Sequence, residues 1–181
     1  MKQLSMILVG VAALVLLLPA SAALGQQPGP TTVAEKRFEA ADPPAQAEVQ
    51  QVVLDFAPGA WTPTHTHGGD VYVMVLEGAV TLRQGGREET FRAGEGWIDS
   101  RDEPHAAGNG GATTARLVAT FVLPRGATPT TVVETGATGA VPPGPTTVAQ
   151  FRGDLPALSR PLDVIQRALE FAPGVSAAVH T

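Results

Sequence analysis

Two histidines separated by one residue are the side chains of this sequence best suited to metal chemistry. His65 and His67 flank Thr66. Alternate side chains of a β-strand point to the same side, so both imidazoles can face one point. Their nitrogens suit transition metals such as Fe, Mn, Ni, Cu or Zn. His105, the only other histidine before residue 180, supplies a third donor. The sequence therefore predicts one divalent metal ion bound by His65, His67 and His105.

Short strands between turns are the elements expected to position these histidines. Apolar or alternating segments occupy 49–56, 71–76, 79–84, 88–91, 97–99, 105–109 and 115–123. Gly, Pro and charged residues separate these segments, and Gly85-Gly86 is typical of a tight hairpin. Many short strands at regular spacing favour an all-β sandwich or barrel, and a jelly roll is the closure expected for this number.

The first histidine pair lies in a stretch that resembles the first motif of the cupin superfamily. That motif consists of a Gly, His-x-His, an acidic residue and a second Gly at fixed spacing. Gly59, His65, His67 and Gly78 stand at the matching positions. The resemblance covers roughly residues 45–125 and implies a cupin jelly-roll β-barrel of the small type-2 class, with its metal near the mouth.

The third histidine lies in a stretch that resembles the second cupin motif. Gly94, His105 and Asn109 match the motif, whereas Ser100 and Asp102 stand where the family has Pro and Gly. Two motifs in the right order and spacing make the resemblance specific. The alternative is that the histidines are only exposed turn residues or hydrogen-bonded structural ones, or that a degenerate barrel binds nothing.

The acidic position of the first motif is where this sequence departs from the family. Most cupins use a Glu there as a further ligand, but Val71 takes its place and Asp70 is one residue away. A slip of one residue points a strand side chain to the other face, so Asp70 would ligate only if a bulge re-aimed it. Three neutral ligands would leave the charge of the ion uncompensated and would favour anionic substrates. Acidification through the imidazole range should release the metal.

The ends of the chain are expected to lie outside this barrel. Residues 1–22 carry Lys2, an apolar run at 6–18 and small residues before Ala23, which is typical of a cleaved secretory signal peptide. Secretion or export to the periplasm follows, with no membrane span left after cleavage near Ala22. An uncleaved anchor is the alternative. Residues 23–44 are expected as an arm, 45–125 as the cupin barrel and 126–145 as a flexible linker.

The last segment, 146–181, is expected to be the truncated start of a second cupin repeat. The segment 28–34 recurs at 143–149, 54–59 recurs closely at 169–174, and His65-Thr66 recurs as His180-Thr181, all at one offset of 115 residues. This is an internal duplication. Either a tandem protein is cut short, or the tail docks as extra strands on its own or a neighbouring barrel.

Composition limits the kinds of ligand and partner that this chain is expected to bind. Cysteine is absent, so neither disulfides nor thiolate ligands contribute. The formal net charge is −5 and the basic residues are scattered, which argues against a nucleic-acid partner. A small-molecule ligand is expected, and a homodimer is compatible with the sequence.

Three functions stay open at this stage. The first is a metal-dependent enzyme, by resemblance an oxygenase or isomerase, acting on a small and perhaps anionic molecule. The second is a non-catalytic module that binds a small molecule, and the third is a barrel whose metal is purely structural. The sequence identifies no catalytic residues.

Overall fold

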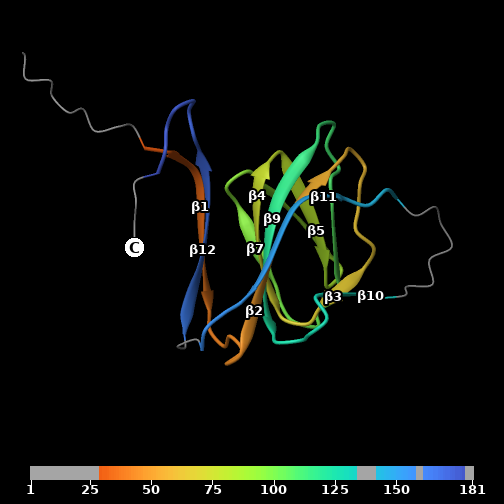
Figure 1. Cartoon of the computed structure of the whole chain (residues 1–181). Coiled ribbons are helices and arrows are strands. Elements are labelled where there is room, and N and C mark those ends of the chain that lie inside the picture. Colours follow the sequence, from red (N-terminus) through yellow and green to blue (C-terminus); the bar gives the residue numbers. More distant parts are fainter. Residues whose placement is uncertain (1–28, 134–141, 158–160, 178–181) are drawn as a thin grey trace, which may run out of the picture.

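The computed structural model describes residues 29–133, 142–157 and 161–177, and these residues form strands and turns without any helix (Figure 1). The expected signal peptide lies outside them. No helix in this described part is long and apolar enough to cross a membrane. The strands are β1 Thr31–Ala40, β2 Ala47–Phe56, β3 His65–His67, β4 Asp70–Glu77, β5 Ala79–Gln84, β6 Arg87–Arg92, β7 Gly96–Asp99, β8 His105–Gly108, β9 Ala115–Pro124, β10 Thr130–Val132, β11 Thr146–Asp154 and β12 Leu162–Glu170.

Two five-stranded sheets face each other and enclose the main core. One sheet has the order β10-β3-β8-β5-β6 and the other the order β11-β2-β9-β4-β7. Neighbouring strands in both sheets are antiparallel. Apolar side chains from both sheets fill the space between them, among them Phe56 and Val73 from one sheet and Val80 from the other. The all-β jelly roll expected from the sequence is confirmed.

The surroundings of strand β4 explain why its sequence is almost continuously apolar. Val71, Val73 and Val75 face the core between the two sheets. Tyr72, from the opposite face of the strand, is buried in a second apolar cluster with Phe38. Both faces of β4 are thus covered, so the strand lacks the apolar–polar alternation of a half-exposed strand.

The second cluster lies beneath a two-stranded ribbon made of β1 and β12 (Figure 1). This ribbon forms a third layer on the outer face of the sheet β11-β2-β9-β4-β7. Residues 23–44, expected as an arm, therefore contain a strand that pairs with the C-terminal segment. Strands β11 and β12 from the duplicated tail lie on the chain's own barrel, which is the docking alternative considered from the sequence.

The segment expected as a flexible linker contributes to the barrel. Residues 130–132 form β10, which pairs with β3, so the expectation of a linker is wrong for these residues. Further on, the carbonyl oxygen of Pro143 accepts a hydrogen bond from the amide of Trp61 (3.0 Å). Residues 134–141 lie outside the described part of the chain.

Candidate metal centre

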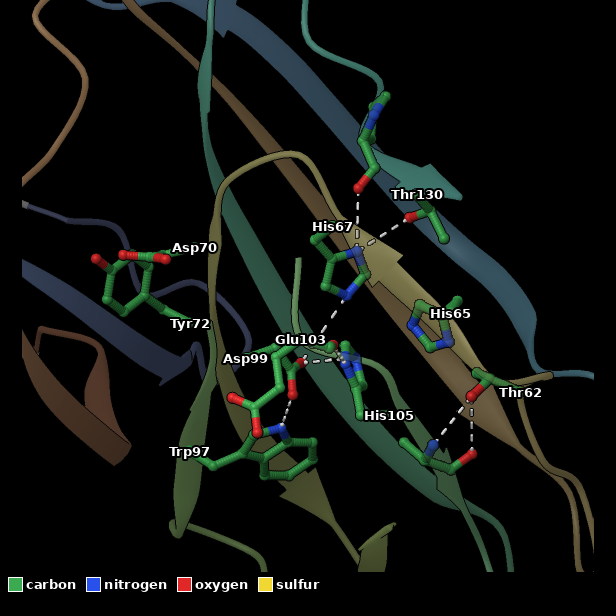
Figure 2. A network of polar contacts seen from close by, with 12 residues as sticks. Thr62, His65, His67, Asp70, Tyr72, Trp97, Asp99, Glu103, His105 and Thr130 are labelled. Carbon is green, nitrogen blue, oxygen red and sulfur yellow. Dashed lines mark hydrogen bonds and ion pairs between the residues drawn. The ribbon is translucent and has the colours of Figure 1, made fainter. Parts of the chain in front are cut away.

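Strands β3 and β8 bring the three predicted histidines together. His65 and His67 alternate on β3 and both point inward, with 7% and 5% of their surface exposed. His105 begins β8 and lies directly opposite His65 in the antiparallel pair. The two neighbours on one strand and the third across the ladder converge on one point inside the barrel (Figure 2).

The geometry of the three rings fits a single ion. One nitrogen from each ring lies within 4.8 Å of the others. The ring centroids are 4.8 Å apart for His65 and His67, 4.4 Å for His65 and His105, and 4.9 Å for His67 and His105. The three buried histidines therefore form a group that could hold a metal ion.

Backbone carbonyls hold all three rings in the orientation that ligation needs. The Nδ1 atoms of His65, His67 and His105 lie 2.8, 3.0 and 2.9 Å from carbonyl oxygens of residues 63, 129 and 103. A carbonyl only accepts, so each Nδ1 carries the proton and each Nε2 keeps its lone pair. Such carbonyl partners commonly orient metal-binding histidines, so this donor set fits a metal.

Burial keeps these histidines neutral in the metal-free protein. It lowers the pKa of His65 and of His105. The pKa of His67 falls to about 3, because burial is reinforced by the neighbouring His65 and His105. Neutral imidazole is the form that binds metal, so no proton has to leave these rings at neutral pH.

Asp99 is a carboxylate of the site that the sequence analysis missed. Its Oδ2 lies 3.4 Å from Nε2 of His105 and 4.0 Å from Nε2 of His67 (Figure 2). Its Oδ1 accepts a hydrogen bond from the indole Nε1–H of Trp97 (2.8 Å). One carboxylate oxygen is thus held by Trp97, while the other faces the histidines.

Burial raises the pKa of Asp99 to about 7, against the smaller opposing effect of the Trp97 hydrogen bond. A cation beside Oδ2 would favour the ionised form. Asp99 therefore changes the charge balance expected for three neutral ligands. The sequence carries one signal for this residue, because Trp97 and Asp99 alternate on a short strand just before His105 and both point inward. The first cupin motif, in contrast, has its carboxylate beside the first histidine pair.

The structure places Asp70 away from the histidines, which corrects its inclusion as a further ligand. Its Oδ1 accepts the backbone amide of Arg101 (3.0 Å), and Figure 2 shows its side chain beside Tyr72. Val71 lines the cavity instead. The strand is regular at this point, so no bulge turns Asp70 inward.

The other motif residues shape the backbone around the site. Gly59 and Gly94 have φ values of 76° and 84°, which favour glycine. Asp102, which stands where the cupin motif has Gly, takes the same left-handed region with φ 60°. Asn109 is buried, and its Nδ2 donates to the carbonyls of Phe56 (2.8 Å) and Thr113 (2.7 Å), so its role is structural.

A cavity of about 250 Å³ opens beside the histidines. Apart from the histidines and Asp99, no titratable side chain lines it among the described residues. The remaining lining is mainly apolar and comes from both sheets: Leu54, Phe56, Val71, Val73, Trp97, Ala107, Leu117, Ala119, Phe121 and Val132, with Thr62, Pro63, Thr130 and Pro145 completing it.

Comparison with known proteins identifies the barrel. Residues 52–121 match the family model described as a cupin domain. The match shows a cupin domain within the barrel, as the two motifs predicted. The chain matches no curated protein.

Solved structures of similar fold cover about half of the chain. The polyketide cyclase RemF from Streptomyces resistomycificus is 25% identical, with 59% of this chain and 75% of that chain covered and a TM-score of 0.43. A protein with a double-stranded β-helix domain from Klebsiella pneumoniae is 23% identical, with 59% and 90% covered and a TM-score of 0.42. A cupin superfamily protein from Desulfitobacterium hafniense is 15% identical, with 49% and 78% covered and a TM-score of 0.39.

Proposed function

We propose that this protein is an exported, metal-dependent cupin enzyme that activates a small, mostly apolar molecule through an oxygen donor. The observation that carries the proposal is the convergence of three neutral Nε2 atoms and one carboxylate oxygen at the end of an apolar cavity. Nitrogen and carboxylate donors together suit Fe, Mn, Ni, Cu or Zn.

The residues proposed to hold the metal are His65, His67 and His105, with Asp99 beside them. The backbone carbonyl oxygens that accept hydrogen bonds from Nδ1–H hold the rings with their Nε2 atoms inward. Asp99 contributes a negative charge that offsets part of the charge of the ion. When bound, a divalent metal would polarise an oxygen ligand of the substrate or a bound water.

The cavity defines the class of molecule. At about 250 Å³ it is smaller than the usual 300–1,000 Å³ of drug-sized pockets, and it suits a molecule of about one ring with short substituents. Phe121 lies edge-on to the ring of His67, with centroids 5.0 Å apart, so apolar and aromatic surface reaches the metal centre. An apolar body that carries one or two oxygen donors, such as an enolate, a diketone or a catechol, fits this lining.

The roles of the chain's own groups follow from their positions. The apolar walls exclude water from the bound molecule, which strengthens electrostatic interactions inside the cavity. Asp99 Oδ2 is the place where a proton can be accepted, since this oxygen faces the histidines while Oδ1 is held by Trp97. Oxygenase and isomerase reactions are the two classes that this arrangement supports.

Turnover tests this proposal. Protein loaded in turn with Fe, Mn, Ni, Cu and Zn would be mixed with catechols, β-diketones and small keto acids, while oxygen uptake and substrate spectra are followed. We expect turnover with at least one metal and its loss in His105→Ala. Raised melting temperatures with these molecules but no turnover would instead support a binding module. A His105→Ala protein that melts lower, with no molecule ever bound by the wild type, would support a structural metal.

Export forms the second part of the proposal and rests on residues 1–22 of the sequence. Expression of the full chain in a bacterium with a periplasm would test it. We expect the protein in the periplasmic fraction, with a mass that corresponds to a start near Ala23. An intact Met1 in the cytoplasm or the membrane would contradict the export.

A further inference from the structure

The orientation of the Asp99 carboxylate depends on Trp97. The indole Nε1–H of Trp97 donates to Oδ1 (2.8 Å), and the two residues are only 8% and 4% exposed. Within the described ranges, Trp97 is the only residue seen to donate a hydrogen bond to this carboxylate. The other oxygen, Oδ2, lies 3.4 Å from Nε2 of His105. The indole therefore decides which oxygen faces the histidines.

Strand β7 places the two side chains next to each other. Trp97 and Asp99 are two residues apart, so both point to the inner face of the strand. β7 is the last strand of its sheet and pairs with β4, where Val73 lies opposite Trp97. Gly96 allows a close approach of the two strands, because a Cβ at this position would overlap the carbonyl oxygen of Val73. This close pairing sets the position of the backbone that carries Trp97 and Asp99.

The ring of Trp97 is held from the other sheet. Phe91, on β6, packs against it with ring centroids 4.7 Å apart and an interplanar angle of 32°. β6 and β7 are the last strands of the two sheets, so this aromatic pair bridges the sheets at their edges. A ring packed in this way has little freedom to turn its N–H away from Asp99.

The choice of hydrogen-bond partner distinguishes Trp97 from a residue that only fills the core. A buried indole N–H needs an acceptor, and a backbone carbonyl would satisfy it equally well. A carboxylate acceptor makes the bond charge-assisted, so it constrains both side chains more strongly than a neutral acceptor would. Groups that orient metal ligands in this way commonly affect metal affinity.

We propose that Trp97 is a positioning residue of the metal centre, whose indole N–H holds Oδ1 of Asp99 so that Oδ2 faces the three histidines and the ion they bind. The inference rests on the proposed function, since it assigns Trp97 a role toward a bound metal. Phe91 supports the same arrangement through the packed ring. Trp97 also lines the cavity, so one indole borders both the carboxylate and the space for a small molecule.

The chain contains two tryptophans, which allows a test in the intact protein. Labelling with nitrogen-15 tryptophan gives two indole N–H resonances, and Trp61→Phe identifies the one that belongs to Trp97. We expect zinc to shift the Trp97 resonance, because the carboxylate that accepts its hydrogen bond then lies beside a cation. A Trp97 resonance that stays in place while zinc binds, or that moves no more than that of Trp61, would overturn the proposal.

A double-mutant cycle separates positioning from packing. Trp97→Phe removes the N–H but keeps an aromatic ring. We expect it to weaken zinc binding about tenfold, measured by competition with a chelating dye. In an Asp99→Asn background the same change should weaken binding less than about twofold, because no charged carboxylate is left to orient. An equal loss in both backgrounds would show that Trp97 only packs the core, and no loss in the wild-type background would equally overturn the proposal.

Cobalt(II) gives a readout that does not depend on affinity, because its visible spectrum reports the number and arrangement of its donors. At saturating cobalt, we expect Trp97→Phe to change this spectrum when residue 99 is Asp and to leave it unchanged when residue 99 is Asn. Identical spectra for Trp97→Phe and the wild type would overturn the proposal.

These measurements also separate this inference from the proposed function. A wild type that binds neither zinc nor cobalt would overturn the proposed function, and this inference with it. A wild type that binds both metals without any coupling between residues 97 and 99 would overturn the inference alone.

Discussion

At the scale of single residues, the site consists of four buried groups whose protonation states depend on one another. Burial lowers the pKa values of the histidines and favours their neutral form, and it raises the pKa of the Asp99 carboxyl group to about 7. A divalent cation would bind the free lone pairs of the neutral rings, and it would stabilise the ionised form of Asp99.

The first prediction concerns the charge of Asp99. Asp99→Asn keeps the shape of the side chain and the oxygen that accepts the Trp97 hydrogen bond, but it removes the negative charge. We expect the affinity for a divalent transition metal to fall about 10–100-fold, as for other groups that support metal ligands. Competition with a chelating dye measures this change, and Asp70→Asn is the matched control. An equal effect of both substitutions would contradict the assignment.

A second prediction concerns the stability of the same variant without metal. The folded pKa of Asp99 is raised from 3.8 to about 7. Its contribution to stability is therefore present below pH 3.8 and is lost as the pH rises through about 7. Across this window the wild type should lose on the order of 3 kcal/mol relative to Asp99→Asn. Urea unfolding of both metal-free proteins at several pH values measures the difference, and parallel pH profiles would refute it.

Acid release of the metal is the third prediction, and it moves the expected pH of release below the ordinary imidazole range. The folded pKa values of the histidines are lowered, so below pH 6.5 the unfolded chain binds more protons than the folded one. The free energy of unfolding therefore falls as the pH falls. We expect the metal to remain bound as the pH is lowered past about 6, and to be released only when the protein unfolds at lower pH. Parallel acid titrations by circular dichroism and a metal-sensitive dye test this, and release from an intact barrel near pH 6.5 would contradict it.

At the scale of elements, the site depends on how closely strand β8 packs against the indole of Trp61. Gly108 forms an isolated bridge with Trp61, and the indole lies directly over it. The guanidinium of Arg83 also lies over the indole of Trp61, 3.6 Å from the ring centroid. Arg83 thus packs on the indole although half of its side chain is exposed.

The fourth prediction tests this close approach. A Cβ added at Gly108 would lie 2.0 Å from the indole carbon Cδ2 of Trp61. We expect Gly108→Ala to destabilise the protein by about 1–3 kcal/mol and to lower its melting temperature by several degrees. Gly110→Ala is the control, because nothing lies within 4 Å of a Cβ at that position. Equal melting temperatures for the two variants would contradict the packing argument.

Local patterns predicted most strands and the histidine group, but not the pairing of distant segments. Alternation and turn residues placed 79–84 and 97–99 on the strands that the structure shows. Strand β10 has three exposed residues and no apolar pattern, so only its pairing with β3 makes it a strand. Asp99 was overlooked because a single inward carboxylate on an apolar strand matches no motif.

At the scale of the whole molecule, three layers serve different purposes. The two five-stranded sheets enclose the cavity, and the β1–β12 ribbon buries the outer face of one sheet (Figure 1). The duplication was evident in the sequence from its constant offset. Which strands the second copy would pair with could not be predicted, because the repeat is equally compatible with its own, an exchanged or an intermolecular partner.

The fifth prediction separates small-molecule binding in the cavity from metal binding by the histidines. Ala119 on β9 is 5% exposed and lines the cavity from the wall of the second sheet. We expect Ala119→Phe to fill much of the space beside the histidines, so that metal content is unchanged while small-molecule binding falls at least about tenfold. Calorimetric titration with any molecule that binds the wild type measures this. Unchanged binding would place the ligand elsewhere.

The central claim is that three converging imidazoles hold one metal ion, and elemental analysis of protein purified without added metal tests it most directly. The account predicts about one transition-metal ion per chain in the wild type and in His180→Ala, which removes the histidine outside the proposed site. His105→Ala should retain less than about one-tenth of that metal. A wild type that takes up no metal even after loading, or a His105→Ala protein with full metal content, would contradict the account.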